Sequence, residues 1–251
     1  MLNGRRRRRL RGYLLRTLGD MPRTIDRGVG AGIVLSASGS NLAYAMGVSE
    51  PAVQAELQRS LRAGMVFYDV GANVGFLTLI ASRLVGPNGQ VIAFEPLADN
   101  VERLQRNLER NATTNVTIVS RALSAKPGRA RMAVPETSDS GALAALDAAA
   151  DAAGPEVLVC TLDGAIDEFG LRQPDLVKID VEGSEVDVVR GMHRTLTTSR
   201  PRLVIEIHED LDDRWRESAI RAELAQLGYR IDRLAGESGG MPHLLAVPPA
   251  G

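Results

Sequence analysis

From residue 50 onward, the apolar positions alternate between a helical period and short continuous runs. Apolar residues recur every four positions in the helix predicted over residues 50–64, whereas residues 65–70 predict a short buried strand. The same alternation predicts helices over 73–84, 100–111, 163–169, 184–196 and 214–227 and strands over 90–94, 116–119, 157–162, 176–180 and 202–207. Residues 129–134 predict an additional strand, and residues 229–234 and 244–247 predict a closing antiparallel pair.

Strands that alternate with helices of this length form right-handed βαβ units, and their parallel sheet is covered on both faces. We therefore predict an α/β fold: a Rossmann-like, doubly wound, mostly parallel seven-stranded sheet with an antiparallel closing strand and an N-terminal helical extension. The predicted boundary separates an extension over 1–49 from one domain over 50–251. The Ala-rich segment 138–154 is either a loop or a marginal helix.

The formal net charge of −1 hides an asymmetry. Residues 1–30 hold nine Arg and two acids, which gives +7, so the remaining 21 basic and 29 acidic residues give −8. Charge interrupts the apolar stretch after Arg5–Arg9, which argues against a secretory signal, and leucines at 10, 14 and 18 indicate a short basic amphipathic helix. One interpretation of this tail is a solvated end, and the other is weak contact of Arg5–Arg9 with a membrane surface or a partner. A homodimer formed through this segment is a further hypothesis.

Composition excludes several classes of protein. Apolar runs stay shorter than about 18 residues, which predicts no transmembrane helix. The single cysteine, Cys160, excludes an intramolecular disulfide framework and fits a reducing, cytoplasmic compartment. The near-neutral charge, together with only four Phe, four Tyr and one Trp, argues against a nucleic-acid partner.

Acidic residues stand where the predicted strands end. Asp69, Glu95, Asp180 and Glu206 lie at the carboxyl ends of four strands, and His208 follows the last of them. In an open parallel sheet, ligands bind in the crevice beyond these ends. The pattern therefore predicts a functional crevice at one edge of the sheet.

The segment after the first of these strands, residues 69–75, is rich in glycine. Gly71 and Gly75 allow a sharp turn and close approach to a ligand, but the segment lacks the spacing of a phosphate loop or of GxGxxG. A carboxylate at Asp69 would repel a pyrophosphate and suits an ammonium group, and Glu95 is placed to accept two hydrogen bonds from a ribose diol. S-adenosylmethionine carries an ammonium group and a ribose but no phosphate, so it suits both carboxylates.

The stretch from residue 44 to 208 resembles the FkbM family of S-adenosylmethionine-dependent methyltransferases. The resemblance is carried by FYDVGANVGF at 67–76, AFEP at 93–96, ALS at 122–124, TLD at 161–163, VKIDVEGSE at 177–185 and IEIH at 205–208. It implies that the cofactor is S-adenosylmethionine and that the acceptor is a small molecule or glycan, most commonly methylated on a hydroxyl. The cofactor residues implied by the resemblance are Asp69, Gly71, Asn73, Gly75, Glu95, Pro96, Arg121, Ala122 and Asp180. Glu50 and Gln54 resemble the family's approach to the cofactor turn.

A hydroxyl acceptor needs a general base, for which the candidates are Asp180, Glu182 and His208. His208 titrates near neutrality, which favours it as the base, although a histidine that fixes a loop is an equal interpretation. Asp180 is expected to hold the cofactor amine or the acceptor hydroxyl. We predict no metal; the alternative is a divalent ion on Asp180, Glu206 and His208.

Two other classes of function stay open. One is a catalytically silent nucleoside-binding module, because a fold does not imply activity. The other is an NAD(P)-dependent oxidoreductase on the same architecture, which the missing GxGxxG and the acidic turn disfavour.

Overall fold

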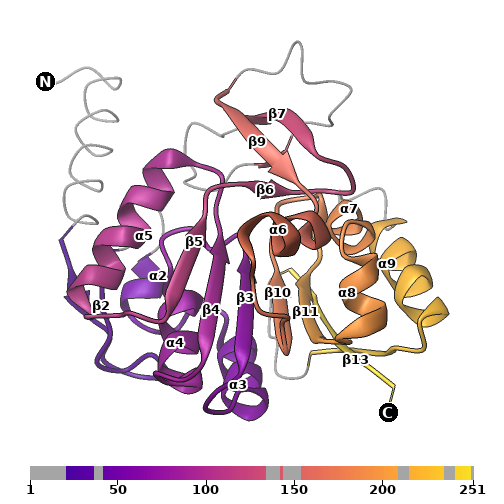
Figure 1. The fold of residues 1–251 in the computed structure, drawn as a ribbon. Coiled ribbons are helices and arrows are strands. Elements are labelled where there is room, and N and C mark those ends of the chain that lie inside the picture. The colour runs from indigo at the N-terminus through magenta and orange to yellow at the C-terminus, as the bar shows by residue number, and fades with distance from the viewer. Residues whose placement is uncertain are drawn as a thin grey trace, which may run out of the picture.

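The computed structural model describes residues 21–36, 42–133, 142–143, 154–208, 215–234 and 241–249. A seven-stranded sheet runs through the centre of the molecule in the order β12-β13-β11-β10-β3-β4-β5 (Figure 1). Within it only β13 is antiparallel to its neighbours. The strands are β3 (Val66–Val70), β4 (Gln90–Phe94), β5 (Val116–Val119), β10 (Leu176–Ile179), β11 (Arg202–Glu206), β12 (Arg230–Arg233) and β13 (His243–Val247). The predicted doubly wound fold is confirmed.

Helices cover both faces of this sheet. Along β3, Phe67 packs into a core with helices α3, α4 and α5, whereas Val66, Tyr68 and Val70 pack into a second core with α6, α7, α8 and α9. Because both faces are buried, every residue of β3 is buried, and its residues other than Asp69 are apolar or aromatic instead of alternating with polar ones. The helices are α3 (Pro51–Ser60), α4 (Phe76–Val85), α5 (Ala98–Arg110), α6 (Leu162–Phe169), α7 (Glu185–Arg190), α8 (His193–Thr198) and α9 (Trp215–Gln226).

Residues 21–36, which lie within the predicted extension, pack against the domain. They form a hairpin of β1 (Arg23–Thr24) and β2 (Val34–Leu35), and Ile25 and Ile33 belong to the same core as α4. The guanidinium of Arg83 on α4 donates hydrogen bonds to the carbonyls of residues 31 and 32. A short helix, α2 (Leu42–Ala45), follows. The predicted basic helix and Arg5–Arg9 lie outside the described residues.

A small sheet in the order β6-β9-β7-β8 lies beyond the end of β5 (Figure 1). Its β7 confirms the additional strand predicted near residue 130. Of the Ala-rich segment 138–154, only residues 142–143 and 154 are described, and the first two form β8. The strands are β6 (Ala122–Leu123), β7 (Gly128–Ala133), β8 (Ala142–Leu143) and β9 (Glu156–Cys160).

Three predicted helices differ clearly in their bounds. The helix predicted over 50–64 ends at Ser60. The helix predicted from residue 73 begins at Phe76, because Asn73 and Gly75 have φ of 49° and 91°. The helix predicted over 184–196 is interrupted at Gly191, where a Cβ would lie 2.1 Å from the carbonyl oxygen of Ser124. This close approach of two backbones requires glycine at 191, the position where α7 ends.

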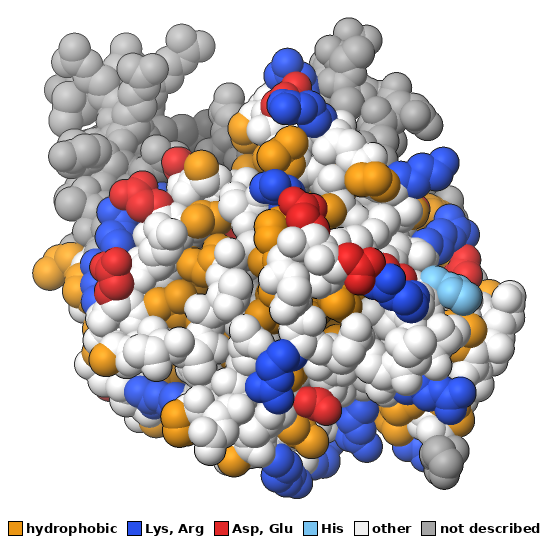
Figure 2. All heavy atoms as spheres, viewed as in Figure 1, with side chains coloured by type: hydrophobic (Ala, Val, Ile, Leu, Met, Phe, Trp, Pro, Cys, Tyr) orange, Lys and Arg blue, Asp and Glu red, His pale blue; other side chains and the backbone are white. Residues whose placement is uncertain are grey.

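On the face drawn in Figure 2, basic and acidic side chains of the described residues are interspersed rather than gathered by sign. Exposed ion pairs such as Arg129–Glu156 and Arg194–Asp167 belong to this mixed surface. In the part of the chain that the structure describes, no helix combines the length and the hydropathy needed to span a membrane.

Candidate active site

Strand register brings polar side chains together at one edge of the sheet. Lys178 on β10 is directly opposite Asp69 on β3, so the two side chains share a face. Asp180 directly follows β10, and its backbone amide donates to the carbonyl of Val70. The predicted crevice at the carboxyl ends of the strands therefore contains residues from at least two neighbouring strands.

The turn at residues 71–75, which we call the glycine turn, requires its glycines. Gly71 has φ of 85°, and a Cβ there would lie 1.8 Å from the carbonyl oxygen of Asp180. Gly75 has φ of 91°, and a Cβ there would lie 2.2 Å from the side chain of Leu104. Larger residues would collide with backbone at the first position and with the core at the second, so the turn can form only with glycine at both.

Glu95 holds the glycine turn from the end of β4. Its Oε2 accepts from the amide of Asn73 at 2.9 Å, and its Oε1 accepts from the amide of Leu97 and the side chain of Asn100. Burial raises the pKa of Glu95 to about 7, although these hydrogen bonds oppose the shift. The carboxylate predicted to bind a ribose thus fixes the shape of the turn and does not line the pocket beside it.

A pocket of about 260 Å³ lies beside the glycine turn. This volume includes space that is open to solvent. Within it, Oδ2 of Asp69 accepts from the hydroxyl of Thr78, whereas Oδ1 is buried without a hydrogen-bond partner. Burial raises the pKa of Asp69, against the charge of Lys178 and the Thr78 hydrogen bond. The lining comes from Tyr44, Glu50, Asp69, Gly71, Ala72, Asn73, Val74, Phe76, Leu77, Lys178 and Asp180.

Lys178 is a buried cation in this pocket. Its side chain is only 3% exposed, and Nζ donates to Oδ2 of Asp180 at 2.7 Å and lies 3.9 Å from Oε2 of Glu50. Burial alone would lower the pKa of Lys178, but Asp180, Glu50 and other carboxylates hold it well above its usual value. The group is therefore always charged. Sequence reasoning did not assign it a role, although a lone charge in an apolar strand was the available signal.

Asp180 is ionised at neutral pH. Burial would raise the pKa of this carboxyl, but the charge and hydrogen bond of Lys178, together with His208 and His243, lower it below its usual value. The residue lines the pocket and has Oδ1 within 3.7 Å of Nε2 of His208. Among the three predicted catalytic residues, Asp180 is the one in the pocket lining.

His208 lies behind Asp180. Its Nδ1 is 2.8 Å from Oε1 of the fully buried Glu185, and its Nε2 faces Glu182 at 3.5 Å and Glu206 at 3.8 Å. Burial would lower the pKa of His208, but the hydrogen bond to Glu185 and the surrounding carboxylates raise it to about 9. A histidine protonated at neutral pH is a poor proton acceptor, so this geometry favours a role in stabilising its acidic neighbours.

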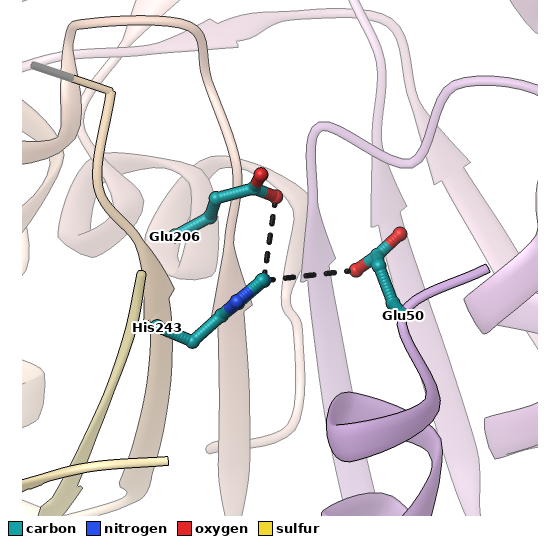
Figure 3. Close-up of side chains that lie close together, drawn as sticks. All are labelled: Glu50, Glu206 and His243. Atoms are coloured by element: carbon teal, nitrogen blue, oxygen red, sulfur yellow. Dashed lines mark ion pairs between the residues drawn. The ribbon is translucent and has the colours of Figure 1, made fainter. Parts of the chain in front are cut away.

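A second histidine, His243, lies at the same edge of the sheet. Glu206 at the end of β11 is the antiparallel partner of His243 at the start of β13, and their side chains approach to 3.4 Å (Figure 3). Glu50, at the start of α3, lies 3.9 Å from the same Nε2 of His243. We call the following six residues the acid cluster: Glu50, Asp180, Glu182, Glu206, His208 and His243. Sequence reasoning missed His243, because its place depends on the register of β13.

The remaining predicted residues are spread around this centre. Arg121 lies 3.8 Å from Glu168 and stacks over the ring of Phe169, and Ala122 is buried in the core of the small sheet. Pro96 follows Glu95 and is half-buried. None of these three is in the pocket lining. The metal trio offered as an alternative is divided between two groups of compatible side chains: Asp180, Glu182 and His208, and Glu50, Glu206 and His243.

Comparison with known proteins agrees with the resemblance seen in the sequence. The family model described as "Methyltransferase FkbM domain", whose cofactor is S-adenosylmethionine, matches residues 69–231. The AMB antimetabolite synthetase AmbE of Pseudomonas aeruginosa is 33% identical in an alignment of 204 positions that covers 66% of this chain and 10% of that protein. The hexuronic acid methyltransferase AglP of Haloferax volcanii is 27% identical over 178 residues, covering 68% of this chain and 70% of AglP.

Solved structures share the fold. The methyltransferase FkbM of Methylobacillus flagellatus superposes with a TM-score of 0.53 at 17% identity, covering 82% of this chain and 55% of that one. The precorrin-6y C5,15-methyltransferase of Geobacter metallireducens gives 0.52 at 18% identity, covering 80% and 90%. This chain thus spans a tenth of AmbE and about half of the M. flagellatus protein. Because the family model matches more than half of the chain, the protein belongs to the FkbM-domain methyltransferases.

Proposed function

We propose that this protein transfers a methyl group from S-adenosylmethionine to a hydroxyl of a sugar or a similar polar natural product. The observation that carries the proposal is the pocket beside the glycine turn, where Oδ1 of Asp69 is buried with no hydrogen-bond partner. A buried carboxylate oxygen without a hydrogen-bond partner carries a free-energy cost, and a cationic donor that bonds to it removes this cost. S-adenosylmethionine brings an ammonium and a sulfonium.

The charge balance of the pocket supports the same ligand. Glu50, Asp69 and Asp180 line it together with one cation, Lys178. Burial raises the pKa of Glu50 and of Asp69, and a cation that enters the pocket favours their ionised forms. With all three carboxylates ionised the lining is net negative, which disfavours a pyrophosphate and favours a positively charged ligand. This charge balance weighs against NAD(P), which carries a pyrophosphate, and therefore against the oxidoreductase alternative.

The residues that fit the cofactor divide into two sets. The glycine turn offers close backbone approach. Glu95 keeps the turn in shape from outside the pocket lining, and a ribose would have to share carboxylate oxygens that already accept hydrogen bonds. Asp69 and Asp180 provide the negative charge that suits the methionine end. When bound, S-adenosylmethionine supplies an electrophilic methyl group, so the protein chiefly has to align an acceptor with it.

For the acceptor, Asp180 is the best-placed group. It is ionised, lines the pocket, and can accept a hydrogen bond from a hydroxyl, which orients that hydroxyl and takes up its proton. Lys178 stabilises the Asp180 carboxylate from one side and His208 from the other. We therefore place Asp180 as the catalytic residue and His208 as a positioning residue.

We infer the chemical class of the acceptor from the name of a relative. AglP is named a hexuronic acid methyltransferase and matches 68% of this chain. A polar sugar also suits the pocket lining, in which Tyr44 and Phe76 are the aromatic rings and the other large groups are charged or apolar aliphatic.

A methyl-transfer screen tests the proposal. The protein is incubated with S-adenosylmethionine carrying a labelled methyl group and with a panel of hexuronic acids, neutral sugars and polyketides, and an Asp180→Asn variant serves as the control. We expect label in a hydroxylated acceptor with the wild type and none with the variant. Label on an amine or carbon acceptor would contradict the hydroxyl assignment, and binding without transfer to any acceptor would favour a silent module.

A further inference from the structure

Three side chains converge next to the pocket but are not explained by methyl transfer. Glu206 and His243 are neighbours because β11 and β13 pair in antiparallel register, and Glu50 reaches them from the start of α3 (Figure 3). Nε2 of His243 is 3.4 Å from Oε2 of Glu206 and 3.9 Å from Oε2 of Glu50. The three residues thus come from three separate elements and point toward one common space.

The donor atoms are suited to a divalent metal ion. Two carboxylates and one imidazole combine the oxygen preference of Mn²⁺ with the nitrogen preference of Zn²⁺. Ligand atoms about 2.0–2.1 Å from a tetrahedral ion lie about 3.3 Å from one another. The distance of 3.4 Å between His243 and Glu206 matches this edge. Glu50 lies farther out, 3.9 Å from His243, and all three ligand atoms are within 4.8 Å of one another, so Glu50 has to move inward to bind the same ion.

The site is built from buried groups. The side chains of His243, Glu50 and Glu206 are 7%, 15% and 16% exposed. Oε2 of Glu50 is shielded from solvent and takes part in no hydrogen bond, although it points at the ring of His243. A buried carboxylate oxygen without a donor is costly, and a metal ion at this position would satisfy it.

Lys178 does not already fill this role. Its Nζ makes a hydrogen bond of 2.7 Å to Asp180 and lies 3.9 Å from Oε2 of Glu50, beyond hydrogen-bond distance. Around it stand four carboxylates, of Glu50, Asp69, Asp180 and Glu206. Lys178 is thus engaged with Asp180 and does not satisfy Oε2 of Glu50, which leaves room for a second cation beside Glu50.

The backbone of Glu50 adds a separate observation. Its φ and ψ are 47° and 53°, in the left-handed region that a residue with a side chain rarely adopts. Such a conformation persists when the surroundings hold it, and it aims the Glu50 side chain away from the axis of α3 and toward β11 and β13.

We propose that Glu50, Glu206 and His243 bind one divalent cation of the Mn²⁺ or Zn²⁺ class, which ties the start of α3 to strands β11 and β13. The proposal goes beyond methyl transfer, because the ion is held by residues of which only Glu50 lines the cofactor pocket. Binding of the ion is measured without cofactor or acceptor, so its failure and the failure of the proposed function are distinguishable.

Titration of the metal alone tests this site. The full-length protein is stripped with a chelator, dialysed and titrated with Mn²⁺, and free Mn²⁺ is followed by electron paramagnetic resonance; Zn²⁺ is titrated in a parallel calorimetric experiment. We expect one ion per chain. Because loss of even an outer partner of a metal ligand typically costs 10–100-fold in affinity, His243→Gln should weaken binding by at least about 100-fold.

The matched control is Glu182→Gln, which removes a carboxylate from the neighbouring group of Asp180, Glu182 and His208. We expect its Mn²⁺ affinity to stay within about threefold of wild type. Circular dichroism checks that each variant is folded, and Glu206→Gln replaces His243→Gln if the latter does not fold. Absence of saturable binding of both ions to the wild type, or binding lost in Glu182→Gln and kept in His243→Gln, would overturn the proposal.

Discussion

The glycine turn and the acid cluster lie at the same edge of the sheet, but their polar groups are satisfied in different ways. In the turn, both carboxylate oxygens of Glu95 accept hydrogen bonds of 2.9 Å from backbone amides. In the acid cluster, Nε2 of His208 and of His243 lie 3.4–3.9 Å from their carboxylate neighbours. Asp180 and His208 each have one short hydrogen bond as well, to Lys178 and to Glu185, so the cluster combines short contacts with long ones, and the proposed cation would lie among the long ones.

The two regions therefore contribute different properties to the site: the glycine turn contributes shape, and the acid cluster contributes charge. The glycine turn contributes a rigid surface whose form depends on sterics and short hydrogen bonds, so changes there should act on folding and on cofactor fit together. The acid cluster contributes negative charge that its own lysine and histidines balance only in part, so changes there should act on catalysis and on ion binding. Four substitutions test this division.

The largest effect is expected for Gly71→Ala in the glycine turn. The added Cβ would lie 1.8 Å from the carbonyl oxygen of Asp180, which is backbone and cannot move aside. We expect a loss of at least about 4 kcal/mol in the free energy of unfolding, measured with urea, together with loss of cofactor binding. Gly64→Ala is the control, because Gly64 has φ of 88° but no atom within 4 Å of its Cβ position, so it should cost only about 1–2 kcal/mol. Equal losses in the two variants would show that sterics do not define the turn.

Asp180→Asn tests the catalytic role of the acid cluster. The amide keeps the size of the side chain but cannot take a proton from a hydroxyl, so turnover should fall by about 10²–10⁴-fold while the far-ultraviolet circular dichroism is unchanged. Asp187→Asn, at a side chain that is 51% exposed on α7, should keep full turnover. Full activity in Asp180→Asn would remove this residue from the mechanism.

Lys178→Met tests how the acid cluster is held together. Removing the buried cation leaves Asp180 and Glu50 without their nearest positive charge, and we expect a loss of about 3 kcal/mol in stability. The chain has two lysines, and Lys126→Met at the exposed one should change stability by less than about 0.5 kcal/mol. Chemical denaturation measures both. A Lys178→Met protein as stable as wild type would mean that the carboxylates do not depend on this cation.

The smallest of the four effects is a pH dependence in the glycine turn. The pKa of Glu95 is raised from 4.5 to about 7 by burial, so the folded state holds this proton more tightly than the unfolded state. The resulting stability is present below pH 4.5 and is lost as pH rises through about 7, and between pH 5 and 8 it amounts to about 2 kcal/mol.

Glu95→Gln should flatten the dependence of the free energy of unfolding on pH. The hydrogen bonds lost in this variant lower the stability by the same amount at every pH, so they do not change the slope. Urea unfolding from pH 5 to 8 measures the slope, with Glu102→Gln at an exposed position of α5 as the control. An unchanged slope in Glu95→Gln would show that Glu95 is not the group that titrates.

The fold and the glycine turn could be predicted because their signals are local. The run from Met65 to Val70 and the two glycines that follow specify a buried strand and a tight turn within eleven residues. Alternation of strands and helices then leaves few ways to arrange a parallel sheet. The need for glycine at 191 could not be predicted, since the atom that excludes a Cβ there is the carbonyl oxygen of Ser124, more than sixty residues away.

The acid cluster could be predicted only in part. Asp180, Glu182, Glu206 and His208 follow strand ends and were found in the sequence. His243 joins them through the antiparallel register of β13, and Glu50 joins through the packing of α3, neither of which a local pattern contains. Lys178 is hidden for another reason: its partners come from three elements, and only the assembled pocket explains a buried charge in an apolar strand.

The central claim is that the pocket beside the glycine turn holds S-adenosylmethionine through its carboxylates, and calorimetric titration of the purified protein with this cofactor tests it most directly. We expect one site per chain, binding at least about tenfold weaker in Asp69→Asn because a buried acceptor for the cofactor's positive charge is lost, and no heat with NAD. Absence of binding to the wild type, or equal affinity in wild type and Asp69→Asn, would contradict the account.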